Sequence, residues 1–574
     1  MKISYILGIN TTYHELSACL LKDGQLVAAV EEGRFTRIKH GKPALVSNPD
    51  VLPKQSIDFC LRKAGITFAE VGQIGISFCP KERLKNIGID KYFTEGDWGS
   101  KSGEELFYEK IMNVPKLLSE YAGIDLTDKT VWVPHHISHA GSAYYVSPFK
   151  ESAVLSIDGI GEITTTWLGL GSGNKMSVIK EIAYPNSIGF LWEKLSKFLG
   201  FSEYDAAKVM GLASFGDKNR FHSLFQKIVS IESDGNFTVD EDVLSFRLND
   251  FEPLEKLFGV NKLNSPDERT TAHEDVAAGL QAITNDTVLN LAKYLSETTK
   301  SKNLCLAGGV ALNCVSNFEI MRVGYFENIY IQPAAHDAGT ALGAAYYLWN
   351  DLQSQSREFV MEHAFWGPDF SEREIENVLI TEGVQYKKLA NIEEVTAKLI
   401  SEGNIVGWFQ GKMEWGPRAL GNRSLLVDPR DITMKETLNM RIKKREPFRP
   451  FAPSVLSEDT NDWFEIPQNC TSISTEFMEF AFPVKAEKRN VIPAITHVDG
   501  TSRIQIVRKE INPKYHSLIS EFKKITGVPI VLNTSFNENE PIVCSPLDAV
   551  KTFKKTKMDY LAIQDFLVSK EPEK

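Results

Sequence analysis

Short apolar runs separated by polar turns recur along the first third of the chain. Three runs near the N-terminus predict three strands, and Lys22-Asp23-Gly24 between the last two has the composition of a hairpin turn. In a second set of three, Asp158-Gly159-Ile160-Gly161 follows the first strand. The six strands are predicted over Ile3–Ile9, Leu16–Leu21, Gln25–Glu31, Ala153–Ile157, Thr164–Leu170 and Met176–Glu181. Because both sets place a polar turn after their first strand, the pattern predicts two units built on one plan.

Longer stretches with apolar residues at helical spacing predict the helices. They are expected over Lys54–Lys63, Gly103–Tyr121, Ala272–Thr299 and Ala338–Tyr347. Residues 217–270 are polar, and we expect an irregular insertion there. Two strand units that are each followed by helices resemble the plan shared by actin, the sugar kinases and the heat-shock chaperone ATPases.

Two later strands end in residues suited to ligand binding. Asn303–Ala307 runs into Gly308-Gly309, where a backbone without side chains lets a ligand approach closely. Ile329–Pro333 leads to Asp337 at the start of a helix of small residues. Ligands in open α/β sheets bind at the carboxyl ends of strands. We therefore favour ligand binding over the alternative of two plain strand-to-helix turns.

His135 and His139 stand four residues apart in a stretch expected to be helical, and Asp158 ends the apolar run of a nearby strand. Side chains at this spacing share a helix face, with Cβ atoms about 5–6 Å apart. Two imidazoles and a carboxylate so placed can bind one metal ion. The alternative is a chance pair in a packed helix. A zinc-protease interpretation is excluded because His136, and not the catalytic Glu, follows His135.

Trp366-Gly367-Pro368 has the composition of a domain junction. Beyond it, Arg, Lys, hydroxyl and amide side chains concentrate in four segments rich in Gly, Pro and aromatic residues. These segments are residues 411–424, 441–451, 497–503 and 533–537. Arginine binds oxyanions by paired hydrogen bonds, and lysine acts as a compact charge. The pattern predicts an anionic small substrate, and the alternative is solvated surface charge.

Composition narrows the class of protein. Of 574 residues, 43% are hydrophobic and 24% are charged, as in a globular chain of several structural domains. A formal net charge of −11 disfavours a nucleic acid as the main partner. The seven cysteines lack a Cys-x-x-Cys pair, as expected of reduced thiols in a cytosolic enzyme. With no secretory signal and no apolar run of about 18 residues, we expect a cytoplasmic protein with no membrane partner.

Taken in order, the motifs resemble those of the NodU/CmcH/TobZ family of O-carbamoyltransferases. Tyr13-His14-Glu15 is close to the family's Tyr-His-Asp, and residues 31–40 are close to its Glu-Glu-x-Arg-Phe-x-Arg-x-Lys-His. His-x-x-x-His, Asp-Gly-x-Gly, Gly-Gly-Val-Ala-Leu-Asn and His-Asp-x-Gly follow at residues 135–139, 158–161, 308–313 and 336–339. The C-terminal third resembles the family's YrdC-like domain, so the resemblance covers nearly the whole chain. Two positions depart from the family pattern, since Glu15 replaces an Asp and Ala207 replaces a Gly.

The resemblance implies an α/β fold in which a duplicated actin-like (ASKHA) N-terminal domain is joined to a smaller α/β YrdC-like C-terminal domain. The first domain is similar to that of the TsaD-type tRNA threonylcarbamoyl transferases. Residues 1–355 are expected to transfer the carbamoyl group, and residues 366–574 to form carbamoyl-adenylate.

The implied activity is that of an ATP-dependent carbamoyltransferase. Carbamoyl phosphate and ATP, with Mg²⁺, would give carbamoyl-adenylate. The carbamoyl group would then pass to a hydroxyl of a small natural product such as a sugar or an aminoglycoside.

The resemblance also implies roles for single residues. His14 is the expected general base, and Lys443, Arg418 and Ser535 are the other expected catalytic residues. The residues expected to bind nucleotide and phosphate are Lys39, Gly308, Gly309, Asn313, Arg449, Arg503 and Asn533. The expected metal ligands are His135, His139, Asp158 and Asp337. They would hold Fe(II) in the family's pattern, and Zn or Mn also suits such ligands.

Two other functions stay open at this point. A tRNA-modifying enzyme of the threonylcarbamoyl type would use both domains, but it predicts a basic RNA-binding face that a net charge of −11 does not favour. A non-catalytic actin-like ATP-binding module that regulates a partner would have no need of Lys443.

Overall fold

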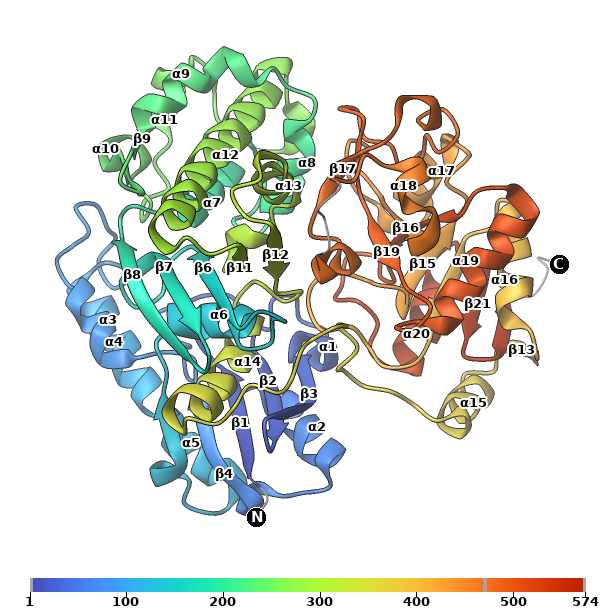
Figure 1. The fold of residues 1–574 in the computed structure, drawn as a ribbon, viewed down its shortest axis with the longest axis horizontal. Helices are drawn as coiled ribbons and strands as arrows, with labels where there is room; N and C mark the ends of the chain where they lie inside the picture. Colours follow the sequence, from blue (N-terminus) through green and yellow to red (C-terminus); the bar gives the residue numbers. More distant parts are fainter. Residues whose placement is uncertain (1–3, 468–471, 571–574) are drawn as a thin grey trace. The chain divides into compact units, whose positions relative to one another are not determined.

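The computed structural model describes residues 4–467 and 472–570 and divides the chain into two compact units. Among the described residues, the first unit comprises 4–36, 40–361 and Ser472, and the second comprises 37–39, 362–467 and 473–570. Ile3, at the start of the first predicted strand, and Cys470 lie outside the described residues. Figure 1 follows the chain through both units.

The first unit contains two five-stranded sheets of the same topology. In the first, the order is β3-β2-β1-β4-β5, with β1 antiparallel to β2 and parallel to β4. In the second, the order is β8-β7-β6-β11-β12, with β6 antiparallel to β7 and parallel to β11. The strands are β1 (Tyr5–Asn10), β2 (Ser17–Lys22), β3 (Gln25–Glu31), β4 (Val71–Ile76), β5 (Thr130–Trp132), β6 (Glu151–Ile157), β7 (Thr164–Ser172), β8 (Lys175–Ala183), β11 (Asn303–Ala307) and β12 (Asn328–Ile331). The repeated topology confirms the predicted duplicated actin-like fold.

Two helices, α6 (His135–Tyr144) and α14 (Ala338–Tyr346), lie between these sheets (Figure 1). The contacts of α14 with α6 and with β1 both depend on a glycine. A Cβ at Gly343 would lie 1.6 Å from the carbonyl oxygen of Ser138 in α6, and a Cβ at Gly8 in β1 would lie 1.9 Å from the carbonyl oxygen of Ala341. The close approach fixes the start of α14, which directly follows Asp337.

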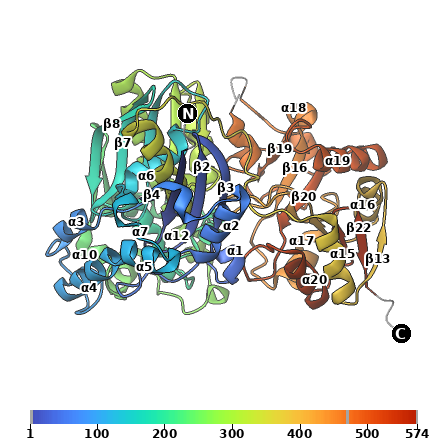
Figure 2. The ribbon, with the colours of Figure 1, turned by 90° about the horizontal axis from the view of Figure 1, so that it is seen from below.

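Among the remaining helices of the first unit, α2 packs on β2 and β3 (Figure 2), whereas α8 and α13 pack on α12. These remaining helices include α1 (Gly33–Thr36), α2 (Lys54–Ala64), α3 (Pro80–Arg83), α7 (Ile188–Phe198), α8 (Ala206–Ala213), α12 (Thr271–Thr299) and α13 (Cys314–Val323). The predicted single helix over Gly103–Tyr121 is wrong: the structure has α4 (Lys101–Met112) and α5 (Val114–Ala122). Pro115 lacks the N–H that a continuous helix needs, and it sits in the first turn of α5.

The prediction of an irregular insertion over residues 217–270 is also wrong. The structure has α9 (Lys218–Ile228), β9 (Val229–Glu232), β10 (Asn236–Val239), α10 (Glu241–Leu244) and α11 (Glu252–Phe258) in this segment. Phe221, Phe225 and Ile228 recur at helical spacing and are buried where α9 packs against α12. That spacing was the available signal, and the polar residues between these three positions obscured it.

The second unit is built on one eight-stranded sheet of order β13-β22-β21-β14-β15-β20-β16-β19. Its strands are β13 (Gln385–Lys388), β14 (Val406–Phe409), β15 (Arg423–Val427), β16 (Ala452–Leu456), β19 (Gln505–Val507), β20 (Ile530–Ser535), β21 (Tyr560–Ile563) and β22 (Phe566–Ser569). A separate pair joins β17 (Ala481–Pro483) to β18 (Thr501–Arg503). Its helices are α15 (Glu372–Thr381), α16 (Ile392–Ser401), α17 (Thr433–Leu438), α18 (Thr460–Trp463), α19 (Pro513–Thr526) and α20 (Pro546–Lys555). The predicted second, smaller α/β part of the chain is thus confirmed.

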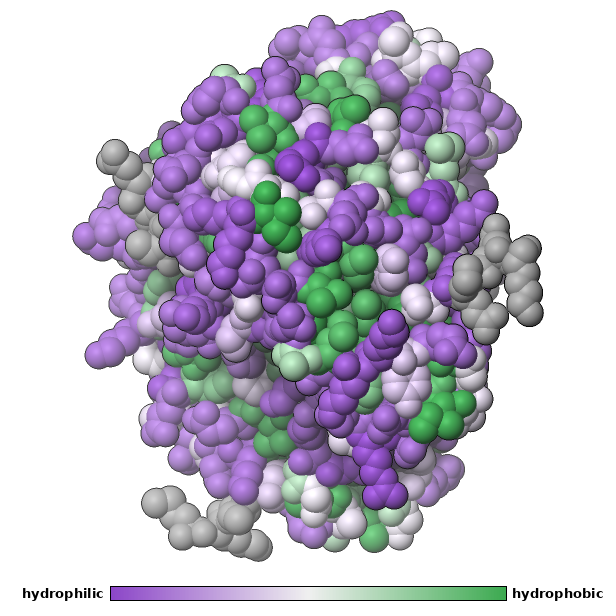
Figure 3. Space-filling view, turned by 90° about the vertical axis from the view of Figure 1, so that its right-hand side faces the viewer, coloured by the Kyte–Doolittle hydropathy of each residue, from purple (hydrophilic) through white to green (hydrophobic). Residues whose placement is uncertain are grey.

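Apolar side chains on the face drawn in Figure 3 form small groups among hydrophilic ones. No helix in the described parts of the chain is long and apolar enough to cross a membrane.

Replacing Gly343 by alanine tests the contact between α6 and α14. The added Cβ would overlap the Ser138 carbonyl oxygen, so we expect the free energy of unfolding to fall by about 1–3 kcal/mol, as for other overpacked cores. Urea unfolding followed by circular dichroism measures the change. Gly72→Ala is the control, because its Cβ would lie 3.3 Å from the nearest atom at an exposed position. Equal stability of the two variants would contradict the role assigned to Gly343.

Candidate functional site

Side chains from three separated segments converge between the two sheets of the first unit. His135 and His139 project from α6, Asp158 follows β6, and Asp337 precedes α14. The Nε2 atoms of His135 and His139 are 3.1 Å apart. Each lies 3.5–3.6 Å from Oδ2 of Asp158 and from Oδ1 of Asp337. The structure therefore brings together all four residues predicted as metal ligands, with their ligand atoms within 4.8 Å of one another.

These distances and donor types fit one divalent transition-metal ion. Nitrogen and oxygen ligands about 2.1 Å from such an ion lie about 3.0–3.4 Å apart at right or tetrahedral angles. His135 Nδ1 lies 3.3 Å from the carbonyl oxygen of Ser77, which can only accept a hydrogen bond. Nδ1 therefore carries the proton, and Nε2 is left free to bind a metal. His136 is not part of the set, because its Nδ1 bonds to Ser156 Oγ at 2.9 Å.

The charges of the four groups compensate one another. Burial alone would raise the pKa values of both carboxyls, but His135 and His139 hold the pKa of Asp158 well below its usual value. The pKa of Asp337 is held at about 2 against burial by His14 and by the same two imidazoles. Conversely, the two carboxylates raise the pKa of His135 despite its burial. Both aspartates are thus ionised at neutral pH, as metal ligands must be.

The glycine pair predicted to approach a nucleotide positions Asp158. The backbone N–H of Gly309 donates to Asp158 Oδ1 at 2.7 Å. Gly308 has φ 87°, and a Cβ there would lie 2.2 Å from the carbonyl oxygen of Ile157. Only glycine allows the turn after β11 to reach the end of β6 so closely.

Asn313 and Lys39, the other two residues of the first domain predicted to bind nucleotide, have partners other than Asp158. The side-chain oxygen of Asn313 caps α13 by accepting from the N–H groups of Val315 and Ser316, and its Nδ2 donates to Gln281 at 3.0 Å. Lys39 belongs to the second unit by its contacts, not to the unit that contains the glycine pair.

His14, the predicted general base, lies at the edge of the metal-ligand cluster. Its Nδ1 is 4.0 Å from Asp337 Oδ2, and its side chain is 26% exposed. The ring packs edge-on against Tyr204, with centroids 5.3 Å apart. Asn10 holds the turn by donating from Nδ2 to the carbonyl oxygens of His14 and Glu15. A solvent-accessible imidazole beside the cluster can take up a proton from a bound hydroxyl.

Glu162 also shapes this site, although the sequence analysis did not single it out. Its buried carboxylate accepts from the backbone N–H of Cys79 at 2.7 Å and of His135 at 3.0 Å. It therefore ties the first residue of α6 to the end of β4 and to the turn after β6. A negative charge at a helix N-terminus is also favourable to the helix dipole. Its place directly after the Asp-Gly-x-Gly turn was the only sequence signal.

In the second unit, Lys443 and Ser535 lie in direct contact. Lys443 Nζ donates to the carbonyl oxygen of Ser535 at 2.5 Å, to Ser535 Oγ at 3.1 Å and to Asn537 Oδ1 at 2.6 Å. Lys443 is 2% exposed. Burial, followed by the positive charges of Arg445 and Arg449, lowers the pKa of Lys443 well below its usual value. A bound anion would oppose this lowering and favour the charged ammonium form of Lys443.

Further positive side chains surround this lysine. Lys39 also lowers the pKa of Lys443, and Arg503 lowers that of Arg445. Within the described residues, the buried Nη2 of Arg445 has no hydrogen-bond partner. Sequence reasoning did not single out Arg445, although it stands between Lys443 and Arg449 in one of the predicted segments.

The two remaining predicted residues have distinct surroundings. Burial raises the pKa of the Glu479 carboxyl to about 7, although the positive charges of Arg418 and Arg503 lower it. Asn533 is buried within the sheet, and its Nδ2 donates to Ser454 Oγ at 3.0 Å and to the carbonyl oxygen of Ala419 at 3.1 Å. The amide nitrogen of Asn533 is therefore engaged by hydrogen bonds inside the sheet.

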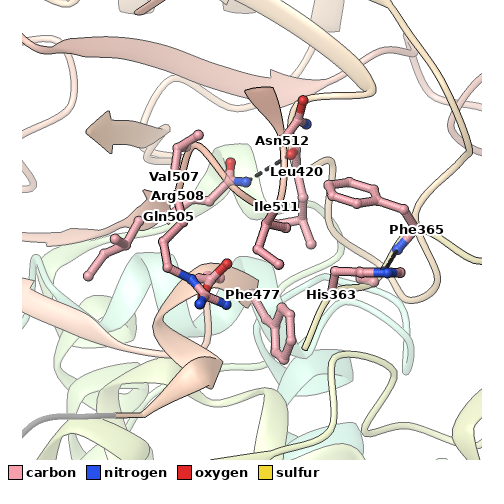
Figure 4. Close-up of a pocket in the computed structure, with 12 residues that line it drawn as sticks. His363, Phe365, Leu420, Phe477, Gln505, Val507, Arg508, Ile511 and Asn512 are labelled. Carbon is pink, nitrogen blue, oxygen red and sulfur yellow. Dashed lines mark hydrogen bonds and ion pairs between the residues drawn. The ribbon is translucent and has the colours of Figure 1, made fainter. Parts of the chain in front are cut away.

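A small pocket of the second unit shares none of the predicted binding residues (Figure 4). Its empty volume is ≈ 280 Å³, including space open to solvent. Phe365, Phe477 and Ile511 line it together with Arg508, whose Nε bonds to Glu476 at 2.5 Å. Gln505 in its wall donates to the carbonyl oxygen of Leu420. Because none of the predicted site residues lines it, the pocket is not part of the candidate site.

Glu162→Gln tests whether this carboxylate positions the metal ligands. The amide keeps one oxygen for the N–H groups of Cys79 and His135, but it removes the negative charge and places an NH2 group, which cannot accept, where Oε2 lies 3.2 Å from the His135 nitrogen. We expect the affinity for Zn²⁺ or Fe²⁺ to fall about tenfold, as for other supporting residues of metal sites. Competition with a chromophoric chelator measures the affinity, and a thermal melt reports folding. Glu151→Gln, at the exposed start of β6, is the control; equal affinities would show that Glu162 does not position α6.

Comparison with known proteins agrees with this picture. The family model described as carbamoyltransferase N-terminus matches residues 5–346, and the one described as carbamoyltransferase C-terminus matches residues 397–570. The chain is 40% identical to nodulation protein NolNO of Sinorhizobium fredii, over 98% of this chain and 80% of that protein. It is 39% identical to nodulation protein NolO of Bradyrhizobium diazoefficiens, over 76% and 79%.

A third relative carries an enzyme name. The chain is 29% identical to 3'-hydroxymethylcephem-O-carbamoyltransferase of Amycolatopsis lactamdurans, over 58% of this chain and 59% of that protein. With family models matching both of its halves, the chain belongs to the carbamoyltransferase family and is a transferase enzyme.

Proposed function

We propose that this enzyme makes carbamoyl-adenylate from carbamoyl phosphate and ATP and transfers the carbamoyl group to a hydroxyl of a small natural product. The observation that carries the proposal is the buried Lys443–Ser535–Asn537 contact, set among Arg445 and Arg449 in an acidic protein. The acceptor class follows from the cephem relative, whose printed name specifies O-carbamoylation. Residues 366–574 would form the adenylate, and residues 1–355 would transfer its carbamoyl group.

The first reaction is balanced with one water molecule. Carbamoyl phosphate and water give carbamate and phosphate, and carbamate oxygen then attacks the α-phosphorus of ATP and releases pyrophosphate. Lys443, Arg449 and Arg503 would bind the phosphate oxygens, where negative charge develops as each bond breaks. Arg418 and Ser535 would orient the carbamoyl group. Mg²⁺ would accompany ATP as a co-substrate, as is usual for polyphosphates.

The second reaction joins the acceptor oxygen to the carbamoyl carbon, and the bond from that carbon to the AMP oxygen breaks. His14 would receive the hydroxyl proton, because it is the accessible imidazole beside the cluster. When bound by His135, His139, Asp158 and Asp337, a divalent ion would act as a Lewis acid at this step. We propose Fe(II) there, and Zn or Mn suits the same donors. The N–H of Gly309 holds Asp158 in place for this role.

Carbamoyl-adenylate formation in the absence of an acceptor tests the first reaction directly. With carbamoyl phosphate, ATP and Mg²⁺, we expect carbamoyl-adenylate by mass spectrometry and pyrophosphate in a coupled assay. Lys443→Ala is expected to lower the rate by about 10²–10³-fold, as for the loss of one charge-stabilising donor. Lys444→Ala is the matched control, since Lys444 is exposed and pairs with Glu538. Formation of carbamoyl-adenylate at the full rate by Lys443→Ala would refute the assignment.

Binding of ATP should be accompanied by proton uptake at Lys443. In the free protein, burial and the neighbouring positive charges hold its pKa well below the usual value, so the amine loses its proton at a lower pH than an exposed lysine does. A bound polyanion favours the charged form and raises that pKa, so binding takes up a proton above the free pKa and none far below it. Calorimetry over a series of pH values, in buffers of different ionisation enthalpy, measures the uptake. It should vanish in Lys443→Met and persist in Lys444→Met; uptake that is equal in both variants would contradict this assignment.

A further inference from the structure

The loop between β14 and β15 carries Arg418 and is closed by a buried carboxylate. Glu414 is 2% exposed. Its Oε1 accepts hydrogen bonds from three backbone N–H groups in the returning arm of the loop. The donors are the nitrogens of Leu420 at 2.8 Å, Asn422 at 2.9 Å and Arg423 at 3.1 Å. One oxygen atom thus fixes the path of the chain on the C-terminal side of Arg418.

A buried arginine binds the opposite kind of backbone group in the same loop. Arg423 is fully buried, and its Nη1 and Nη2 atoms donate to four carbonyl oxygens. The acceptors are Gln410 at 2.6 Å, Asn422 at 2.9 Å, Pro368 at 3.1 Å and Gly411 at 3.2 Å. The guanidinium also lies 3.6 Å from the centroid of the Phe409 ring. Glu414 therefore holds N–H groups of the loop, and Arg423 holds its carbonyl groups.

The two charges stabilise each other in the protein interior. Burial lowers the pKa of Arg423 to about 10, and the carboxylate of Glu414 raises it. The guanidinium is therefore charged at neutral pH. A buried charge is stable when it is both paired and hydrogen-bonded, and Glu414 and Arg423 each meet this condition.

The arm of the loop that precedes Arg418 is fixed by the chain just after residue 362. The backbone N–H of Trp415 donates to the carbonyl oxygen of Ala364 at 2.6 Å. Gly416 then turns the chain with φ 105°, a conformation that favours glycine. Pro417 follows, and its ring restricts the next φ angle. The direction in which the backbone enters Arg418 is thus set on this side as well.

Two side chains of the eight-stranded sheet support the arm that follows Arg418. Asn533, on β20, donates from Nδ2 to the carbonyl oxygen of Ala419 at 3.1 Å. Gln505, on β19, donates from Nε2 to the carbonyl oxygen of Leu420 at 2.8 Å (Figure 4). The sheet and the buried carboxylate therefore hold the same short stretch of backbone from two directions.

The fixed loop presents a guanidinium where positive charges gather in the second unit. Arg418 and Arg503 both lower the pKa of the buried Glu479 carboxyl, so both lie near one carboxylate. Arg503 in turn lowers the pKa of Arg445, which lowers that of Lys443. Arg418 is therefore held on the side of the unit that carries the proposed anion site.

We infer that Glu414 is a positioning residue for Arg418: together with Arg423, its carboxylate holds the loop in the arrangement that presents the Arg418 guanidinium to carbamoyl phosphate. An arginine held in one arrangement loses less conformational freedom when a ligand binds, so affinity rises without a new contact. The inference rests on the proposed function and deepens it, because it assigns the placement of a substrate-binding group to a residue that does not touch the substrate.

Glu414→Gln in the full-length enzyme tests the inference. The initial rate of pyrophosphate release, without an acceptor, gives the half-saturating concentration of each substrate. Within the described residues, Oε2 of Glu414 is buried and has no hydrogen-bond partner. The amide would therefore bury an NH2 group without an acceptor, and it would remove a negative charge near Arg423. We expect the half-saturating concentration of carbamoyl phosphate to rise about tenfold and that of ATP to stay the same.

Three comparisons separate positioning from a general loss of stability. Glu394→Gln, exposed on α16, is the matched control. A smaller folded fraction lowers the maximal rate but leaves both half-saturating concentrations unchanged, and a thermal melt of each variant reports folding. If Glu414 acts through Arg418, Glu414→Gln adds nothing to the effect of Arg418→Ala on carbamoyl phosphate. Glu414→Asp, which keeps the charge and shortens the reach, should give a smaller increase.

Two kinetic outcomes overturn the inference: equal half-saturating concentrations of carbamoyl phosphate in Glu414→Gln and Glu394→Gln, or additive effects of Glu414→Gln and Arg418→Ala. If Glu414→Gln does not fold, the same criteria apply to Glu414→Asp. If the unsubstituted enzyme forms no carbamoyl-adenylate, calorimetry of carbamoyl phosphate binding replaces the rate. Binding weakened about tenfold by Glu414→Gln, but not further in the Arg418→Ala background, then means that the proposed function fails and the positioning role stands. No binding of carbamoyl phosphate overturns both.

Discussion

The convergence of two buried carboxylates on two buried imidazoles is the constraint on which the first unit depends. Burial destabilises each carboxylate, and its neighbour adds repulsion, whereas His135 and His139 offset both effects. The groups come from α6, from the end of β6 and from the start of α14. They meet only if both sheets stay close to the two helices between them. Backbone contacts at Gly343 and Gly8, where no side chain fits, set that distance.

The duplication of the fold gives the two halves of this unit equivalent turns with different chemistry. The turn after β1 carries His14, and the turn after β6 carries Asp158. Both strands are central in their sheets, so each turn lies where strand ends meet and ligands bind in open α/β folds. The metal-ligand cluster and the proposed general base thus come from one architectural position used twice, and Glu162 ties the second turn to α6.

The second unit concentrates positive charge in a protein whose net charge is −11. Lys443 lies among Arg445, Arg449 and Lys39, and its pKa is lowered first by burial and then by these positive charges. Repulsion among these positive charges lowers the stability of the free protein, and a bound polyanion would reduce that repulsion. Four oxygen acceptors from Ser535 and Asn537 around Nζ hold the lysine in place meanwhile.

The sequence by itself determined the strands of both repeats, the order of their turns, and the residue types that form the metal-ligand cluster and the basic cluster. Period-two and helical spacing are local properties, so they can be read along the chain. It failed at residues 217–270, where polar positions obscured the apolar stripe of α9. Only the tertiary structure decided that Gly309 bonds to Asp158, that Asn313 caps a helix, that Lys39 joins the second unit, and that Glu162 bonds to the first residue of α6. Apart from the Asn313 cap, whose partners are Val315 and Ser316, these roles depend on residues more than twenty positions away, as Glu162 with Cys79 and Gly309 with Asp158 show. Spacing along the chain does not specify such contacts.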